Sequence, residues 1–222
     1  MRTVAIVPCR TGSKGILGKN VRVFHGRPLF AWAVTIGKIT CSEAYVSSDD
    51  HGLEHLARVY GANFIPRPAE LATDEAPMLG VVQHALGVIL KRGDVPPDAL
   101  VLLQPTAPWR TAERVREAIS LLEESGADSV ASVVRLPATH SPEFVIRLRG
   151  DRVLLPPGGI TRRQDAQPAY IRDGTVYVTR RSVIENGSLY GRDCRALVIP
   201  AKESLNLDTE EDWAQAVARA AH

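Results

Sequence analysis

The sequence has 222 residues, 45% hydrophobic and 23% charged, which is the composition of a globular protein. Lysine and arginine outnumber aspartate and glutamate by 27 to 25, and this near balance argues against a nucleic-acid partner bound by phosphate neutralisation. Cys9, Cys41 and Cys194 form no CxxC pattern and no apolar run reaches membrane length, so we expect reduced thiols, no membrane partner and a cytoplasmic location.

Strand-like apolar runs alternate with helix-like stretches from the start of the chain to about Arg135. Strands are predicted at 4–8, 43–50, 62–66, 99–105 and 127–136, and helices at 28–39, 53–60, 78–92 and 112–125. Pro28 suits a helix start, Gly61 a helix stop, and Thr111 is a predicted N-cap. This alternation predicts an α/β fold with a mainly parallel sheet covered by helices on both faces, in three layers.

The alternation is interrupted after Arg135. From about 137 to 177 the chain carries Pro and Gly clusters and short strand-like pieces such as "EFVIRLRG", "DRVLL" and "TVYVTR". It resumes with "RALVIP" and ends in a helix from about Thr209. We interpret 137–177 as an inserted β-rich arm that serves the substrate or a partner subunit, within a single domain that spans 1–222.

Three polar stretches follow predicted strands, where ligands bind in open parallel sheets: "CRTGSKGILGKN", "SSDD" and "QPTAPWR". The first has glycines that allow backbone N–H groups to approach an anion, and Arg10, Lys14 and Lys19 supply positive charge. Its spacing fits neither a Walker A loop nor a dinucleotide fingerprint. The pattern favours phosphate binding over a solvated basic turn.

Six stretches carry a resemblance to a known family. They are "VPCRTGSKGILGKN", "VSSDD", "RPAELATD", "LLQPTAPWRT", "RRQDAQPAY" and "NLDTEEDW". In order and spacing they resemble the acylneuraminate cytidylyltransferase family, the CMP-sialic acid synthetases, over nearly the whole chain. The resemblance implies a Rossmann-like nucleotidyltransferase fold, an arm that mediates dimerisation, and a homodimer.

The resemblance also implies a reaction. Such enzymes transfer CMP from CTP to the anomeric hydroxyl of a nonulosonic acid such as N-acetylneuraminate, release pyrophosphate and use Mg²⁺. The implied catalytic residues are Lys19, Arg10 and Asp208. The implied nucleotide-binding residues are Arg10, Gly12, Ser13, Lys14, Lys19, Asn20 and Arg67. The implied sugar-binding residues are Gln104, Arg163, Gln164, Tyr170 and His140, with Arg163 on the sugar carboxylate, and the implied metal ligands are Asp208 and Asn206.

Several residues have a second interpretation. Asp49 and Asp50 serve the metal or the sugar, or they cap the following helix. Asp208 with Thr209 could likewise cap the last helix, Arg67 could belong to an ordinary turn, and Arg163 could be an arm arginine in solvent. Arg110 is either a phosphate-binding or a structural arginine.

Two departures from the family pattern leave alternative functions to consider. Pro77 and Met78 stand where relatives often have Ser or Thr, and Asn206, a weaker and uncharged Mg²⁺ ligand, stands where many have a second Asp. The alternatives are transfer of CMP to another acid sugar (legionaminate, pseudaminate or 3-deoxy-manno-octulosonate, KDO) or a non-catalytic nucleotide-binding homologue.

Overall fold

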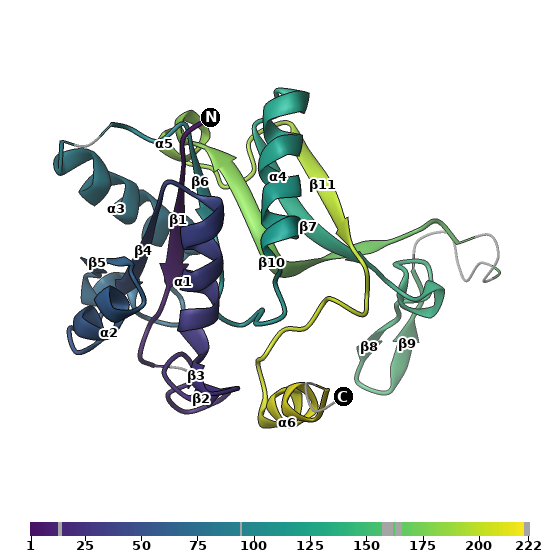
Figure 1. Ribbon diagram of the computed structural model, residues 1–222. Helices are drawn as coiled ribbons and strands as arrows, with labels where there is room; N and C mark the ends of the chain where they lie inside the picture. Colours follow the sequence, from purple (N-terminus) through teal and green to yellow (C-terminus); the bar gives the residue numbers. More distant parts are fainter. Residues whose placement is uncertain (13–14, 94, 157–161, 163–165, 220–222) are drawn as a thin grey trace.

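The computed structural model describes residues 1–12, 15–93, 95–156, 162 and 166–219. Seven strands form one sheet in the order β11-β7-β10-β6-β1-β4-β5 (Figure 1). Their bounds are β1 Thr3–Pro8, β4 Glu43–Ser48, β5 Asn63–Pro66, β6 Ala99–Leu102, β7 Ser129–Arg135, β10 Tyr170–Arg180 and β11 Cys194–Ile199. Strand β10 is antiparallel to β6 and β7, and the other neighbouring strands pair in parallel. The predicted mainly parallel sheet is confirmed.

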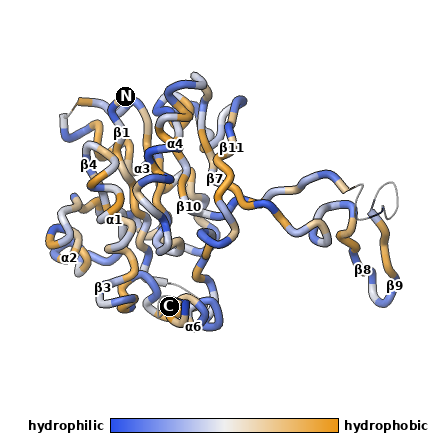
Figure 2. The backbone as a smooth tube through the Cα atoms, turned by 45° about the vertical axis from the view of Figure 1, so that its right-hand side comes forward, coloured by the Kyte–Doolittle hydropathy of each residue, from blue (hydrophilic) through white to orange (hydrophobic). Residues whose placement is uncertain are grey.

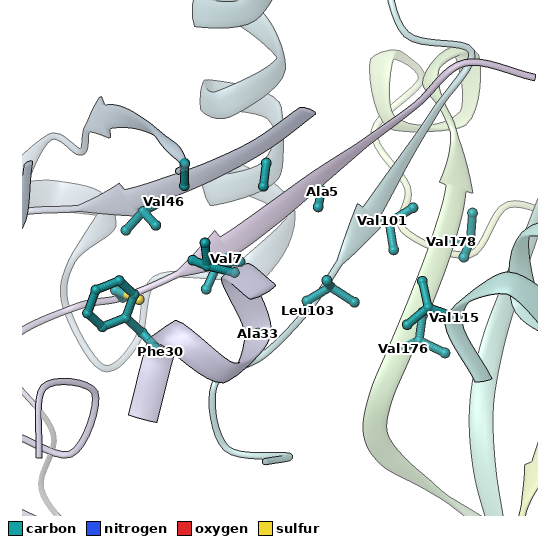
Figure 3. Packing of buried hydrophobic residues seen from close by; sticks show 14 of the residues in the cluster. Ala5, Val7, Phe30, Ala33, Val46, Val101, Leu103, Val115, Val176 and Val178 are labelled. Atoms are coloured by element: carbon teal, nitrogen blue, oxygen red, sulfur yellow. The ribbon is translucent and has the colours of Figure 1, made fainter. Parts of the chain in front are cut away.

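Helices cover both faces of the sheet. On one side lie α1 (Leu29–Thr40), α2 (Leu53–Val59) and α4 (Ala112–Ser125), and on the other lie α3 (Met78–Lys91) and α5 (Arg181–Glu185). Because side chains alternate across a strand, Ala5 and Val7 of β1 pack on the first side, while its Val4 and Ile6 pack on the second. Figure 3 shows the first of these cores, with Val7 beside helix α1.

Local sequence signals fix the helix ends. The hydroxyl of Thr111 accepts a hydrogen bond from the Arg114 amide at 3.3 Å, and Gly126 ends α4 with a φ of 68°. Helix α6 (Glu210–Arg219) begins with a reciprocal cap. The Thr209 hydroxyl accepts from the Asp212 amide at 3.1 Å, and the Asp212 carboxylate accepts from the Thr209 amide at 2.8 Å. Thr209 is therefore the residue that caps α6.

A third apolar cluster joins the two ends of the chain. The hairpin of β2 (Val23–Phe24) and β3 (Arg27–Pro28) contributes Phe24, the preceding loop contributes Ile16, and the C-terminal segment contributes Leu207 and Trp213. Phe24 meets the ring of Trp213 edge to face, with ring centroids 5.4 Å apart. This packing holds α6 beneath the carboxyl end of β1 (Figure 1).

The segment between β7 and β10 projects from the sheet. It contains a 3₁₀ turn at Ala138–His140 and the antiparallel hairpin of β8 (Arg147–Arg149) and β9 (Arg152–Leu154). Two views show the hairpin standing clear of the sheet (Figure 1 and Figure 2). Residues 170–177, assigned above to the arm, instead begin β10 and pair with β7 and β6, so the arm ends near residue 169. A second 3₁₀ turn spans Ala69–Leu71.

No helix within the described ranges is both long and apolar enough to cross a bilayer.

Candidate active site

Two cavities adjoin at the carboxyl edge of the sheet. The first, of about 200 Å³, is lined by Arg10, Lys19, Asn20 and Arg67 together with Pro8 and Thr106. The second, of about 400 Å³, is lined by Arg172, Asp173, Tyr177, Tyr190 and Asn206 among others. Met78 and Gln104 belong to the linings of both. One cationic cavity therefore shares a wall with a larger polar one.

The loop after β1 is held in place by a side chain of its own and by carboxylates from two other segments. The Asn20 amide nitrogen donates to the Arg10 carbonyl at 3.0 Å, and the Arg10 guanidinium lies 2.5 Å from the Asp74 carboxylate. The carboxylate of Asp49 accepts from the Thr11 amide at 3.0 Å and from the Thr11 hydroxyl at 2.6 Å. The backbone of Arg10 is thus held in place, and its side chain lines the first cavity.

The contacts with Thr11 favour the charged form of Asp49. Burial raises the pKa of Asp49, but the hydrogen bonds from Thr11 and the nearby Arg67 outweigh burial and leave the pKa below its ordinary value. Its neighbour Asp50 accepts a hydrogen bond from the Gly52 amide at 2.8 Å, at the start of α2. Both carboxylates of "SSDD" therefore bond to the protein itself, one to the loop and one to the helix start.

Arg67 is a buried arginine beneath the first cavity. Its side chain donates to the Ser47 hydroxyl at 3.1 Å and to the Ser47 carbonyl at 2.6 Å. Burial lowers the pKa of the Arg67 guanidinium, and the Asp49 carboxylate opposes that shift. Arg67 lines the cavity and also ties β5 to the end of β4.

The N-terminal loop meets the C-terminal segment at Lys19. Its ammonium donates to the Leu207 carbonyl at 2.7 Å and lies 3.1 Å from a carboxylate oxygen of Asp208. The other carboxylate oxygen of Asp208 accepts from the Asn206 amide. A Cβ atom at Gly15 would lie 2.0 Å from the Asp208 carbonyl oxygen, so only glycine fits there. Residues almost 190 positions apart form one wall of the site.

Arg110 is a structural arginine rather than an exposed phosphate ligand. It is buried and donates to the carbonyls of Gln104 at 2.7 Å, of Gly174 at 3.3 Å and of Thr175. Burial lowers the pKa of the Arg110 guanidinium, and the Asp173 carboxylate opposes this. These contacts fix the end of β6, where Gln104 stands, against an irregular part of β10.

That irregular part is a β-bulge that shapes the second cavity. Arg172 pairs with Val133 but Tyr177 with Ala131, so β10 carries extra residues between them. Gly174 has a φ of +76°, and a Cβ atom there would lie 3.0 Å from the Gln104 side-chain oxygen. Arg172, Asp173 and Tyr190 line this cavity but are not among the site residues predicted from the sequence. The glycine inside "YIRDGTVYV" is the signal that could have indicated a bulge.

The remaining predicted site residues divide into three groups. Gly12 lies in the loop, where a Cβ atom would be 3.9 Å from the Arg10 guanidinium. His140 and Tyr170 line a separate cavity of about 590 Å³ under the arm, and the structure does not bring them to Gln104 within this chain. Ser13, Lys14, Arg163 and Gln164 lie outside the described residues.

The donor set for a metal is sparse. Across the described part of the chain, no three His, Cys, Asp or Glu side chains gather as a metal cage. Mg²⁺ in nucleotide-binding proteins is commonly held by one or two carboxylates together with substrate phosphates. Asp208, whose side chain is 59% exposed, and Asn206 beside it fit that second arrangement.

Comparison with known proteins gives a consistent result. A family model described as cytidylyltransferase matches residues 4–132. The chain is 33% identical to the CMP-N,N'-diacetyllegionaminic acid synthase of Legionella pneumophila over 96% of this chain and 94% of that protein. It is 29% identical to the N-acylneuraminate cytidylyltransferase of Escherichia coli over 98% of this chain, but over only 52% of that longer protein.

Solved structures agree with the fold. The structure of CMP:2-keto-3-deoxy-manno-octonic acid synthetase complexed with CTP superposes with a TM-score of 0.75 at 17% identity, covering 100% of this chain and 99% of that one. The 4-diphosphocytidyl-2C-methyl-D-erythritol synthase of Anaerococcus prevotii superposes with a TM-score of 0.62 at 15% identity, covering 100% and 99%. The superpositions show the shared fold. The family model and the sequence relatives show that the chain belongs to the cytidylyltransferase family, in the acylneuraminate cytidylyltransferase group.

Proposed function

We propose that this protein transfers CMP from CTP to the anomeric hydroxyl of a nonulosonic acid and releases pyrophosphate. The observation that carries the proposal is the pair of adjoining cavities with Gln104 in both linings. The smaller one presents Arg10 and Lys19 to a triphosphate, and the larger one offers amide and hydroxyl groups to a sugar. Membership of the cytidylyltransferase family supports cytidine as the nucleotide.

For the sugar we propose an N-acylated nonulosonic acid, with the legionaminate type and the neuraminate type as the two candidates. The legionaminate type is supported by the 33% identity to the Legionella synthase, which spans nearly the full length of both chains. The neuraminate type is supported by the E. coli relative, which is 29% identical.

The mechanism is one of positioning and charge stabilisation. The anomeric oxygen attacks the α-phosphate in line with the leaving pyrophosphate, and positive charge stabilises the equatorial oxygens. Arg10 supplies a planar guanidinium that Asp74 orients, and Lys19, in the lining of the same cavity, supplies an ammonium. Gln104, at the junction of the cavities, hydrogen-bonds the sugar hydroxyls.

We propose Mg²⁺ as the cofactor, held by Asp208 and Asn206 with the phosphates. When bound it would neutralise phosphate charge. Asp208 contacts the Lys19 ammonium at 3.1 Å, so a cation on this carboxylate would compete with Lys19 and favour its transfer to the phosphates. Lys19 keeps its hydrogen bond to the Leu207 carbonyl as an anchor.

A substrate panel tests the proposal. The four nucleoside triphosphates are each combined with N-acetylneuraminate, legionaminate, pseudaminate and KDO, with and without Mg²⁺, and pyrophosphate release is measured. We expect turnover with CTP and an N-acylated nonulosonic acid only when Mg²⁺ is present. Turnover with KDO alone would assign another acid sugar, and CTP binding without release of pyrophosphate in any pair would identify a non-catalytic homologue.

For assembly we propose a homodimer formed through the arm. Large apolar side chains of the arm are exposed, among them Val145, Leu148, Val153 and Leu155. Monomeric proteins rarely expose several large apolar side chains together, and such patches commonly mark interaction surfaces. Most soluble oligomers have closed symmetry, so a two-fold dimer is the simplest assembly that would bury these side chains.

A further inference from the structure

A connecting segment carries the C-terminal wall of the site across the sheet. Residues 200–209, the crossing segment, run from the end of β11 to the start of α6 and belong to no helix or strand (Figure 1). In the sheet order β11 stands four strands from β1. Since neighbouring strands are about 4.8 Å apart, these two strands are separated by about 19 Å. The positions of Asn206 and Asp208 therefore depend on the contacts that hold the crossing segment.

The end of the crossing segment nearest α6 is fixed by Leu207. Its amide donates to the Thr106 carbonyl at 2.9 Å, and its side chain is buried in the third apolar cluster. At the other end, the amides of Glu203 and Ser204 donate to the Pro200 carbonyl at 2.8 and 3.2 Å. These two bonds close a turn but lie within the segment, so the end nearest β11 needs a contact with the rest of the domain.

Arg114 of helix α4 makes that contact. Its Nε donates to one carboxylate oxygen of Glu203 at 2.8 Å, and its Nη2 donates to the other at 3.1 Å. Such a two-pronged pair fixes the orientation of both partners as well as their distance. The two side chains are only 23% and 27% exposed. The remaining nitrogen, Nη1, donates to Glu117 of the same helix at 2.8 and 3.0 Å, which holds the guanidinium in place for Glu203.

We infer that Arg114 is a positioning residue for binding of the metal and the nucleotide. Through Glu203 it sets where the crossing segment passes the carboxyl edge of the sheet, and so where Asn206 and Asp208 stand. Asn206 is three residues from Glu203 and Asp208 is five, so a shift of the turn is passed on to both. Arg114 and Glu203 line neither of the two cavities, so their effect passes through the segment. The inference rests on the proposed function and deepens it.

The test measures how CTP binding depends on the metal. The Kd for CTP is determined by calorimetry without sugar, in EDTA and over a range of Mg²⁺ concentrations. We expect Glu203→Gln to need about 10-fold more Mg²⁺ than wild type for half of the gain in CTP affinity, the lower end of the effect of losing a group that supports a metal ligand. Its Kd in EDTA should stay close to that of wild type. Arg114→Lys should show a smaller rise, because an ammonium keeps the charge but not the two-pronged contact.

Glu117→Gln is the matched control, because it changes the other carboxylate on the same guanidinium and leaves the pair with Glu203 intact. It should leave the Mg²⁺ requirement unchanged. An equal rise in Glu117→Gln and Glu203→Gln, or a Kd in Glu203→Gln that is raised equally in EDTA and in Mg²⁺, would make the role of Arg114 purely structural and the inference wrong. A wild type whose CTP affinity does not depend on Mg²⁺ would overturn it as well.

A separate assay of pyrophosphate release keeps the two proposals apart. Excess Mg²⁺ should restore the turnover of Glu203→Gln toward that of wild type, because the variant lacks only the placement of the metal ligands. A turnover that stays low at every Mg²⁺ concentration would contradict the inference about Arg114. If wild type itself releases no pyrophosphate with any acid sugar, the proposed function fails.

Discussion

At the residue scale, the site is built from charged side chains that each have a partner in the protein. Lys19 contacts Asp208, Arg10 contacts Asp74, and Asp49 holds Thr11. A ligand must therefore exchange these contacts for its own. Ion pairs with one partner largely in solvent contribute only about 0–1 kcal/mol, and Asp208 is 59% exposed, so a triphosphate can replace the contact of Asp208 with Lys19 at little cost.

Replacement of Lys19 by alanine should separate catalysis from folding. We expect Lys19→Ala to lower kcat/KM for CMP transfer by about 100-fold or more, because one preorganised donor to the transition state is lost. Its melting temperature should stay close to that of wild type, since the Asp208 partner is 59% exposed. Lys202→Ala, at an exposed lysine, is the control. Near-normal kcat in Lys19→Ala would remove this residue from the chemistry.

The hydrogen bonds from Thr11 to the Asp49 carboxylate predict that the stability of the fold depends on pH. Because the pKa of Asp49 is lowered in the folded protein, its charge stabilises the fold above the ordinary carboxyl pKa of about 4, and that contribution is lost as the pH falls through the lowered value. Asp49→Asn should thus be less stable than wild type at pH 6 to 7, with the difference shrinking below about pH 4. Urea unfolding across this range measures the difference in the free energy of unfolding between the two proteins. A constant difference down to pH 3 would contradict a stabilising role of the Asp49 charge.

At the element scale, the bulge of β10 joins the sheet to the site. Gln104 at the end of β6 and Gly174 in the bulge are drawn together by Arg110, so the wall between the two cavities depends on a buried arginine outside both linings. A change at Arg110 should therefore alter both stability and sugar binding.

Arg110→Met tests the hydrogen bonds by which Arg110 joins β6 to the bulge of β10. The substitution leaves three carbonyls without their donor and Asp173 without its nearby positive charge, and breaking such a buried arrangement costs about 3–5 kcal/mol. Urea denaturation should show a loss of that size, with a raised sugar KM in whatever fraction remains folded. Arg58→Met, at a largely exposed helix arginine paired with Glu54, should change stability by less than about 0.5 kcal/mol. Equal stability of the two variants would show that Arg110 does not stabilise the contact between β6 and the bulge.

At the scale of the whole molecule, the arm leaves the domain and carries its own cavity. His140 and Tyr170 line that cavity together with Val145 and Leu154, away from Gln104 of the same chain. If two chains exchange arms, residues of one arm would reach the site of the other chain, and these two predicted sugar residues would then act in trans.

The dimer can be tested on the arm itself. Leu148 is 66% exposed on β8, and we expect Leu148→Asp to place a charge in the interface and shift the protein from dimer to monomer in analytical ultracentrifugation. Val59→Asp is the control, since Val59 is similarly exposed at 64% but lies on α2 of the main domain. A wild type that sediments as a monomer at all concentrations would contradict the proposed assembly.

The sequence predicted the parts of this molecule that depend on short-range patterns. Apolar alternation up to Arg135, the Thr111 cap and the cationic loop around Arg10 are local signals, and the described elements follow them. The bulge was not predicted, because "TVYVTR" gives no register and β10 begins earlier, at Tyr170. The sequence also could not decide between a phosphate-binding and a structural role for Arg110, since its partners at 174 and 175 become neighbours only once β10 lies beside β6.

The contact of Gly15 with the Asp208 carbonyl has a consequence for biosynthesis. During translation the loop of residues 9–20 leaves the ribosome before most of the sheet, whereas the segment around Asp208 that closes against it follows the last strand of the sheet, β11. A nascent chain therefore contains the whole sheet before its nucleotide site has a second wall. We expect ribosome-bound chains that stop before Asn206 not to bind CTP, whereas chains that extend past α6 should bind it.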